Sequence, residues 1–274
     1  MLDTFIQMFS YDFMLRAVIV GVLVALCSAL LGVTLVLKRY SMIGDGLSHV
    51  GFGALCLALA MNVAPLAVSV PVVVIAAFLL LRISENSRIK GDAAIAMISS
   101  TALAVGILVT SITTGINSDV NGYMFGSILA MSNTDVVVSL VLSAAVLVLY
   151  VVFYNKIFAV TFDESFARAT GTRTGMYNTL ISLLTAVTIV IGMRIMGAML
   201  ISSLIIFPAL TSMRVCRSFR SVVTVSAVVS VLCFFTGLFI SFVYSLPAGA
   251  SVVAVNAAAF GIFSLAGIIK RRVS

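Results

Sequence analysis

The sequence predicts an all-α membrane protein, a polytopic bundle of eight or nine spanning helices. Hydrophobic residues fill 62% of the 274 positions and charged residues only 9%, against roughly 25% charged residues in an ordinary soluble domain. The mean hydropathy is +1.26. Because a span takes about 20 apolar residues, nine spans with short loops fill the chain. We therefore expect a single transmembrane domain over residues 1–274 that is not an enzyme. The net charge of +7 is typical of membrane loops, so no nucleic-acid partner is expected.

Nine apolar runs mark the predicted spans in order. They cover about residues 13–37, 42–61, 65–81, 93–115, 134–154, 176–193, 195–213, 221–245 and 249–269. The two runs on either side of Arg194 could instead form one span and a re-entrant turn, which leaves eight spans as the alternative. The apolar stretch Tyr123–Met131 is too short to cross a bilayer, and we expect it to lie at the extracytoplasmic interface.

The basic residues predict the orientation of the spans. If the first span runs from outside to inside, one face of the membrane receives 14 of the 16 basic residues, and only Arg16 and Arg194 fall elsewhere. The positive-inside rule then places the N-terminus outside and the C-terminus in the cytoplasm. Such a chain crosses the membrane an odd number of times, which favours nine spans over eight.

Asp45 and His49 are the most informative residues of the second predicted span. Only about a dozen apolar residues follow His49 in that run, too few to cross the bilayer, so the span carries both side chains into the membrane. Their i,i+4 spacing places them on one helix face, in a stripe that continues through Phe52 and Cys56. Carboxylate and imidazole groups are suitable ligands for Zn²⁺, Mn²⁺ or Fe²⁺.

One helix supplies only two ligands to such a site. His49 is the only histidine, so a four-ligand site made of these pairs requires a second copy of the helix across a two-fold axis. Gly44, Gly46, Gly51 and Gly53 would let helices approach this segment closely. In the alternative interpretation, Asp45 is only an N-cap and His49 bonds a neighbouring carbonyl, and Asp45→Asn is then tolerated.

The longest predicted cytoplasmic loop contains a short helix. Thr161 and Glu164 fit a capping box and Gly171 fits a C-terminal stop, which predicts a helix of about nine residues. Phe162 and Phe166 fall on one side of it and suggest a docking surface for a partner protein. The alternative is an amphipathic helix on the lipid surface. The chain has no Walker A motif, so any ATP-binding site must lie on another chain.

Taken together, these motifs resemble the manganese/zinc/iron class of ABC-importer permeases along nearly the whole chain. The most specific segments are Val36–His49, Asn121–Leu129, Phe162–Gly171 and Gly197–Leu210. One departure follows Pro208, where this chain has Ala-Leu-Thr-Ser and the family more often has Ala-Ala-Thr-Ala. That difference affects helix packing more than the predicted metal site.

The resemblance implies the type II importer architecture in a bacterial inner membrane. The implied partners are cytoplasmic ATP-binding subunits, a second permease copy or a paralogue, an extracytoplasmic metal-binding protein and membrane lipid. It makes Asp45 and His49 the intramembrane metal site, with no permanently bound cofactor and Zn²⁺ or Mn²⁺ as the transported ion. It assigns coupling to the ATPase to Phe162, Asp163, Glu164, Phe166, Ala167 and Gly171.

Zinc is the first choice of metal, because Asn121–Leu129 and Pro247–Val253 look most like zinc-uptake members; manganese and then iron follow. The rival hypothesis is a secondary, proton-coupled cation transporter that has no ATPase and uses the same pair as a proton relay.

Overall fold

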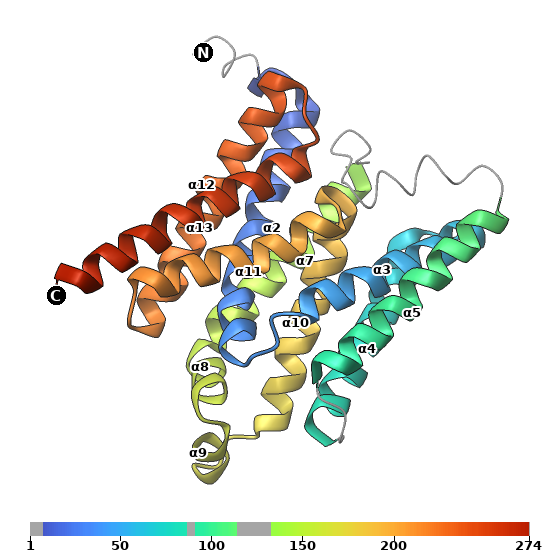
Figure 1. Ribbon diagram of the computed structural model, residues 1–274. Coiled ribbons are helices and arrows are strands. Elements are labelled where there is room, and N and C mark those ends of the chain that lie inside the picture. Colours follow the sequence, from blue (N-terminus) through green and yellow to red (C-terminus); the bar gives the residue numbers. More distant parts are fainter. Residues whose placement is uncertain (1–7, 87–90, 114–132, 274) are drawn as a thin grey trace.

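The computed structural model describes residues 8–86, 91–113 and 133–273, which form a bundle of α-helices (Figure 1). The helices are α2 (Asp12–Leu37), α3 (Ile43–Ala60), α4 (Pro65–Asn86), α5 (Gly91–Ile112), α7 (Asn133–Val152), α8 (Tyr154–Phe162), α9 (Glu164–Ala169), α10 (Thr174–Met196), α11 (Ala198–Val215), α12 (Phe219–Tyr244) and α13 (Ala248–Val273).

The predicted spans agree with the long helices to within a few residues at most ends. Within the described ranges, eight helices are long and apolar enough to cross a membrane, and α4 adds a shorter apolar stretch over Pro65–Leu80. Gly197, which holds φ at +89°, separates α10 from α11. The segment around Arg194 therefore forms two helices, and the prediction of an all-α polytopic bundle is confirmed.

Helix α2 lies at the centre of the bundle. It packs against α7, α10, α11 and α12, and 72% of its apolar window is buried, against 17% for α5 and α13 at the periphery. Polar side chains also join α2 to its neighbours. The Ser230 hydroxyl donates to the Ala25 carbonyl at 3.0 Å, and the Cys27 thiol donates to the Ser143 carbonyl at 3.5 Å.

Glycines allow two helix pairs to meet backbone against backbone. A Cβ built on Gly53 of α3 would lie 2.5 Å from the carbonyl oxygen of Ala102 in α5. A Cβ on Gly32 of α2 would lie only 2.0 Å from the carbonyl oxygen of Ile205 in α11. Real Cβ atoms essentially never come within 3.0 Å of another heavy atom, so only glycine fits at these crossings.

The two ends of the bundle are distinct in Figure 1. The start of α2 and the turn between α12 and α13 lie at one end, whereas the end of α13, α8, α9 and the turn between α11 and α12 lie at the other. Several of the basic residues that predict the cytoplasmic face belong to elements of this second end: Lys156 to α8, Arg168 to α9 and Arg217 to the turn between α11 and α12. The segment between α2 and α3 also lies at this end.

Candidate functional site

Asp45 and His49 lie in the first two turns of α3. The N-cap of this helix is Met42, and Asp45 lies three positions further, inside the first turn. The interpretation of Asp45 as a simple N-cap is therefore wrong. Oδ2 of Asp45 lies 3.7 Å from Nε2 of His49. Two donors on one tetrahedral Zn²⁺ stand about 3.4 Å apart at ordinary bond lengths, so a small side-chain rotation would let both contact one ion.

The pair reaches the surface of the chain on a helix whose first 14 residues are otherwise buried. From Ile43 to Cys56, every residue except Asp45 and His49 is buried. The side chains of Asp45 and His49 are 46% and 28% exposed. Phe52 and Cys56, which the periodicity places on the same stripe, are buried by neighbouring helices. The accessible side chains of this stripe are thus a carboxylate and an imidazole, both of which are common metal ligands.

A serine of α11 contacts the carboxylate of Asp45. The Ser202 hydroxyl donates to Oδ1 of Asp45 at 3.4 Å and lies 3.5 Å from the hydroxyl of Ser48. Ser48 in turn donates to the Gly44 carbonyl one turn back, at 2.8 Å. Sequence reasoning missed this contact, because Ser202 and Asp45 are 157 residues apart. Oδ2, which faces His49, is the carboxylate oxygen left for a cation.

The number of ligands on one chain is small. Among the described residues, no group of three or more His, Cys, Asp or Glu side chains is placed to hold a metal ion. The Asp45/His49 pair by itself therefore supplies two protein ligands, half of an ordinary four-coordinate site. Any further protein ligands of these types must come from undescribed residues or from another chain.

The short helix of the predicted cytoplasmic loop differs from expectation at its start. Thr161 belongs to α8, where its hydroxyl donates to the Ile157 carbonyl at 2.6 Å, so it is not the N-cap. The N-cap is Asp163, whose carboxylate accepts the backbone N–H of Phe166 at 2.9 Å. The predicted helix of about nine residues is consequently two helices, and only α9, with six residues, follows the cap.

The end of α9 agrees with the prediction. Gly171 holds φ at +83°, which a residue without a Cβ adopts at little cost. Its N–H bonds the Arg168 carbonyl at 3.1 Å, and the N–H of Thr172 bonds the Ala167 carbonyl at 2.9 Å. This pair of bonds is a Schellman motif, and it turns the chain back toward α10.

Both predicted aromatic side chains are exposed, but they belong to different helices. Phe162, at the end of α8, is 60% exposed, and its ring lies 4.9 Å from that of Phe158 and 5.9 Å from that of Phe219. Phe166 projects from α9 with 65% of its surface exposed, whereas Ala167 beside it is buried. Phe166 is therefore the prominent apolar side chain on α9.

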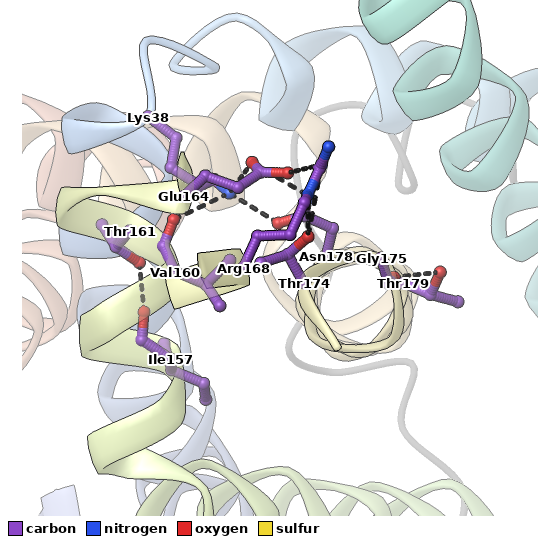
Figure 2. A network of polar contacts seen from close by, with 10 residues as sticks. All are labelled: Lys38, Ile157, Val160, Thr161, Glu164, Arg168, Thr174, Gly175, Asn178 and Thr179. Carbon is purple, nitrogen blue, oxygen red and sulfur yellow. Dashed lines mark hydrogen bonds and ion pairs between the residues drawn. The ribbon is translucent and has the colours of Figure 1, made fainter. Parts of the chain in front are cut away.

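A polar network that the sequence did not predict fixes α9 to the bundle (Figure 2). Lys38, at the end of α2, lies 3.6 Å from Oε2 of Glu164 in α9. Lys38 also donates to Oδ1 of Asn178 in α10 at 2.5 Å. The Asn178 amide donates to Glu164 at 3.2 Å, and Arg168 donates to the other Glu164 oxygen at 3.1 Å. Glu164 thus connects α9 to the end of α2 and to α10, instead of taking part in the predicted capping box of its own helix.

The charge of Glu164 is stabilised by these partners. Burial raises the pKa of its carboxyl, but the hydrogen bond from Asn178 and the charges of Lys38 and Arg168 outweigh burial and lower the pKa below its ordinary value. Glu164 is therefore ionised at neutral pH, and its bond with Lys38 is a charged one.

Some predicted features fall outside the described residues. These are the interfacial segment Tyr123–Met131, the segment Asn121–Leu129 and the side chain of Arg194. The other predicted zinc-type segment, Pro247–Val253, covers the start of α13, where the Ser251 hydroxyl donates to the Pro247 carbonyl at 3.1 Å.

Comparison with known proteins gives consistent matches along the chain. The model of the ABC 3 transport family matches residues 10–267. The manganese transport system membrane protein MntC of Halalkalibacterium halodurans is 28% identical over 94% of this chain and 88% of its own. The high-affinity zinc uptake system membrane protein ZnuB of Haemophilus influenzae is also 28% identical, over 91% of this chain and 96% of its own.

A solved structure has the same fold. A chain of PsaBC from Streptococcus pneumoniae, in complex with Fab, superposes with a TM-score of 0.86 and is 28% identical. The match covers 96% of this chain and 94% of that chain.

Proposed function

Since the chain belongs to the ABC 3 transport family, we propose that it is the permease subunit of an ATP-driven importer for a divalent transition metal ion. Zinc is the first candidate, followed by manganese and iron. The observation that carries the proposal is the Asp45/His49 pair: α3 is covered along its first 14 residues except at these two side chains. An ionisable pair accessible within an apolar span is expensive and is typical of an ion path.

In the proposed mechanism, the ion binds between two copies of α3. An Asp and a His from each of two permease chains give the four ligands that a tetrahedral ion requires. An extracytoplasmic metal-binding protein delivers the ion, and ATP-binding subunits drive the change that releases it to the cytoplasm. In this orientation the end of the bundle with α8 and α9 is cytoplasmic, and the N-terminus lies outside.

The docking site for the ATP-binding subunit is proposed to be α9. Phe166 is its exposed apolar side chain, and the cap at Asp163 and the turn at Gly171 fix both ends of the helix. Exchange of Phe166 for Asp should abolish co-purification of the ATP-binding subunit, while Phe166→Leu should retain it. Equal co-purification with both variants would contradict this role for α9.

The metal site is tested with nearly isosteric substitutions. Asp45→Asn and His49→Gln remove a ligand charge or the imidazole while leaving the volume almost unchanged, so we expect metal uptake to fall at least tenfold. Asp12→Asn, at an exposed position in the first turn of α2, is the matched control. Uptake of ⁶⁵Zn²⁺ and ⁵⁴Mn²⁺ by metal-limited cells gives the readout, and normal uptake by both site variants would refute the site.

The secondary-transporter hypothesis makes a different prediction from the same pair. A proton-coupled carrier imports metal without ATP and responds to a proton gradient. Uptake into vesicles that hold the purified complex separates the two, because an importer of this family requires ATP and a carrier does not. Membership in an ABC transport family favours the ATP-driven mechanism.

A further inference from the structure

Lys38 is a nearly buried cation at the point where α2, α8, α9 and α10 meet (Figure 2). Only 9% of its side chain is exposed. An ammonium group has three protons to donate, and three acceptors surround it: Glu164 at 3.6 Å, Asn178 at 2.5 Å and the Val160 carbonyl at 3.4 Å. A buried charge needs such partners, so the three acceptors hold Lys38 in one position.

The same residue begins the connection to the Asp45/His49 helix. Lys38 is the C-cap of α2, and α3 starts only five residues later. The turn between them is closed by hydrogen bonds from the N–H of Tyr40 to the Leu35 carbonyl at 2.8 Å and from the N–H of Ile43 to the Tyr40 carbonyl at 3.0 Å. A movement of Lys38 is therefore passed to the start of α3 through a short, hydrogen-bonded segment.

Packing also ties this turn to α10. The space enclosed between the turn, the start of α3 and α10 measures about 10 Å³, and its lining includes Lys38, Tyr40, Ile43 and Asn178. A cavity of that size holds at most about one water molecule. The turn and α10 consequently have little room to move independently, and α9 is bonded to both through Glu164.

We propose that Lys38 is a positioning residue that transmits displacement of α9 to the turn before α3, and so couples the docking helix to the Asp45/His49 pair. This inference rests on the proposed function. Lys38 contacts neither the ion nor the ATP-binding subunit in this scheme. Loss of the contact should therefore lower the number of metal ions imported per ATP hydrolysed, rather than remove ion binding or subunit docking.

The test uses the complete transporter, with its ATP-binding subunits and metal-binding protein, in proteoliposomes supplied with Zn²⁺ or Mn²⁺. Metal uptake and ATP hydrolysis are measured in parallel, and their ratio is the readout. We expect Lys38→Met to lower the ratio about tenfold. Lys156→Met, at an exposed lysine of α8 outside the network, is the control and should leave the ratio unchanged.

A double variant separates coupling from folding. Lys38→Met alone leaves Glu164 without its buried cation and can destabilise the chain. Lys38→Met combined with Glu164→Gln removes both charges, so the folded yield should recover while the ratio of metal to ATP stays low. If the role were only structural, the ratio would recover together with the folded yield, and that result would overturn the inference.

The outcomes also distinguish this inference from the function on which it rests. If the unaltered complex shows no ATP-driven metal uptake, the proposed function fails and the coupling role fails with it. If the unaltered complex imports metal and the double variant keeps a normal ratio, only the coupling role is wrong.

Discussion

Three glycine-to-alanine substitutions test how closely the helices must pack. Gly32 lies where α2 meets α11, and Gly53 lies where α3 meets α5. Gly261 lies in α13, and a methyl carbon added there would have no heavy atom within 4 Å. Each substitution adds the same methyl group within a helix, and each gains the same intrinsic helix stability of about 0.5–1 kcal/mol. Differences among the three variants therefore isolate the cost of contact.

The distances set the expected order. The new methyl carbon would lie 2.0 Å from a backbone oxygen at Gly32 and 2.5 Å at Gly53, both below the 3.0 Å that real contacts respect. The backbone cannot rotate away as a side chain can. To restore a 3.0 Å contact, the helices must therefore separate by at least about 1 Å at Gly32 and about 0.5 Å at Gly53. Overpacking costs about 1–3 kcal/mol, and we assign the upper end to Gly32→Ala and the lower end to Gly53→Ala.

Buried thiols provide the measurement. The chain has no tryptophan, but Cys27, Cys56 and Cys233 are buried and become reactive toward a fluorogenic maleimide on unfolding. At roughly 2–4 °C per kcal/mol, Gly32→Ala should melt about 6–12 °C below Gly261→Ala and Gly53→Ala about 2–4 °C below it, because all three variants share the same gain in helix stability. Gly261→Ala should match or slightly exceed the unaltered protein. A Gly32→Ala variant that melts with Gly261→Ala would refute the reasoning.

Three further predictions concern the turn after α2 and the docking helix. Arg39 holds φ at +63°, a conformation that is strained for a residue with a Cβ, so Arg39→Gly should raise stability by about 1 kcal/mol in the same thiol assay; no rise would contradict this. Asp163→Ala removes the N-cap of α9, worth about 1 kcal/mol, and should speed amide exchange in α9 while Asp163→Ser does not; equal exchange in the two would count against the cap. The pKa of Glu164 is lowered from 4.5, so its contribution is complete above about pH 4.5 and is lost as pH falls through the folded-state pKa. Amide protection of α9 should therefore persist at pH 4.5 and decline below it, with no such decline in Glu164→Gln.

The long helices could be predicted because the residues at their ends mark their limits. Charged residues and Pro65 interrupt apolar runs whose length the bilayer fixes, so the predicted spans and the helices agree to within a few residues at most ends; the break predicted at Arg194 lies at Gly197. Asp45 and His49 were likewise found from length and spacing alone, since too few apolar residues follow His49 to form a span without them. The confirmed part of the prediction, the all-α bundle, thus rests on short stretches of sequence, whereas the metal-binding role of Asp45 and His49 stays a prediction.

The start of α9 shows where local patterns compete. Thr161 and Asp163 are both good N-cap residues, and each stands at a plausible distance before the apolar positions. The structure extends α8 through Thr161 because Ile157 and Val160 on its inner face are buried, and that burial keeps Thr161 helical. Asp163 then becomes the first residue free to cap the next helix. The capping preferences of neighbouring residues could not reveal that tertiary contact.

The contacts of Lys38 and Ser202 were beyond sequence reasoning for a different reason. Lys38 reads as one more basic residue at a membrane face, and its partner Asn178 lies 140 residues away. Ser202 lies 157 residues from Asp45. Such pairs follow from how the helices pack, and no local spacing encodes them.

The central position of α2 has a consequence for how the protein is made. This helix is the first of the described helices to leave the ribosome, yet the hydrogen-bond partners of its polar interior come much later in the chain. Ser143 follows its partner Cys27 by 116 residues, and Tyr150 follows Thr34 by the same number. Ser230 follows its partner Ala25 by 205 residues. The middle of the bundle therefore cannot close until α12 has entered the membrane. Nascent chains halted before α12 should expose an unfinished centre that membrane quality control can recognise.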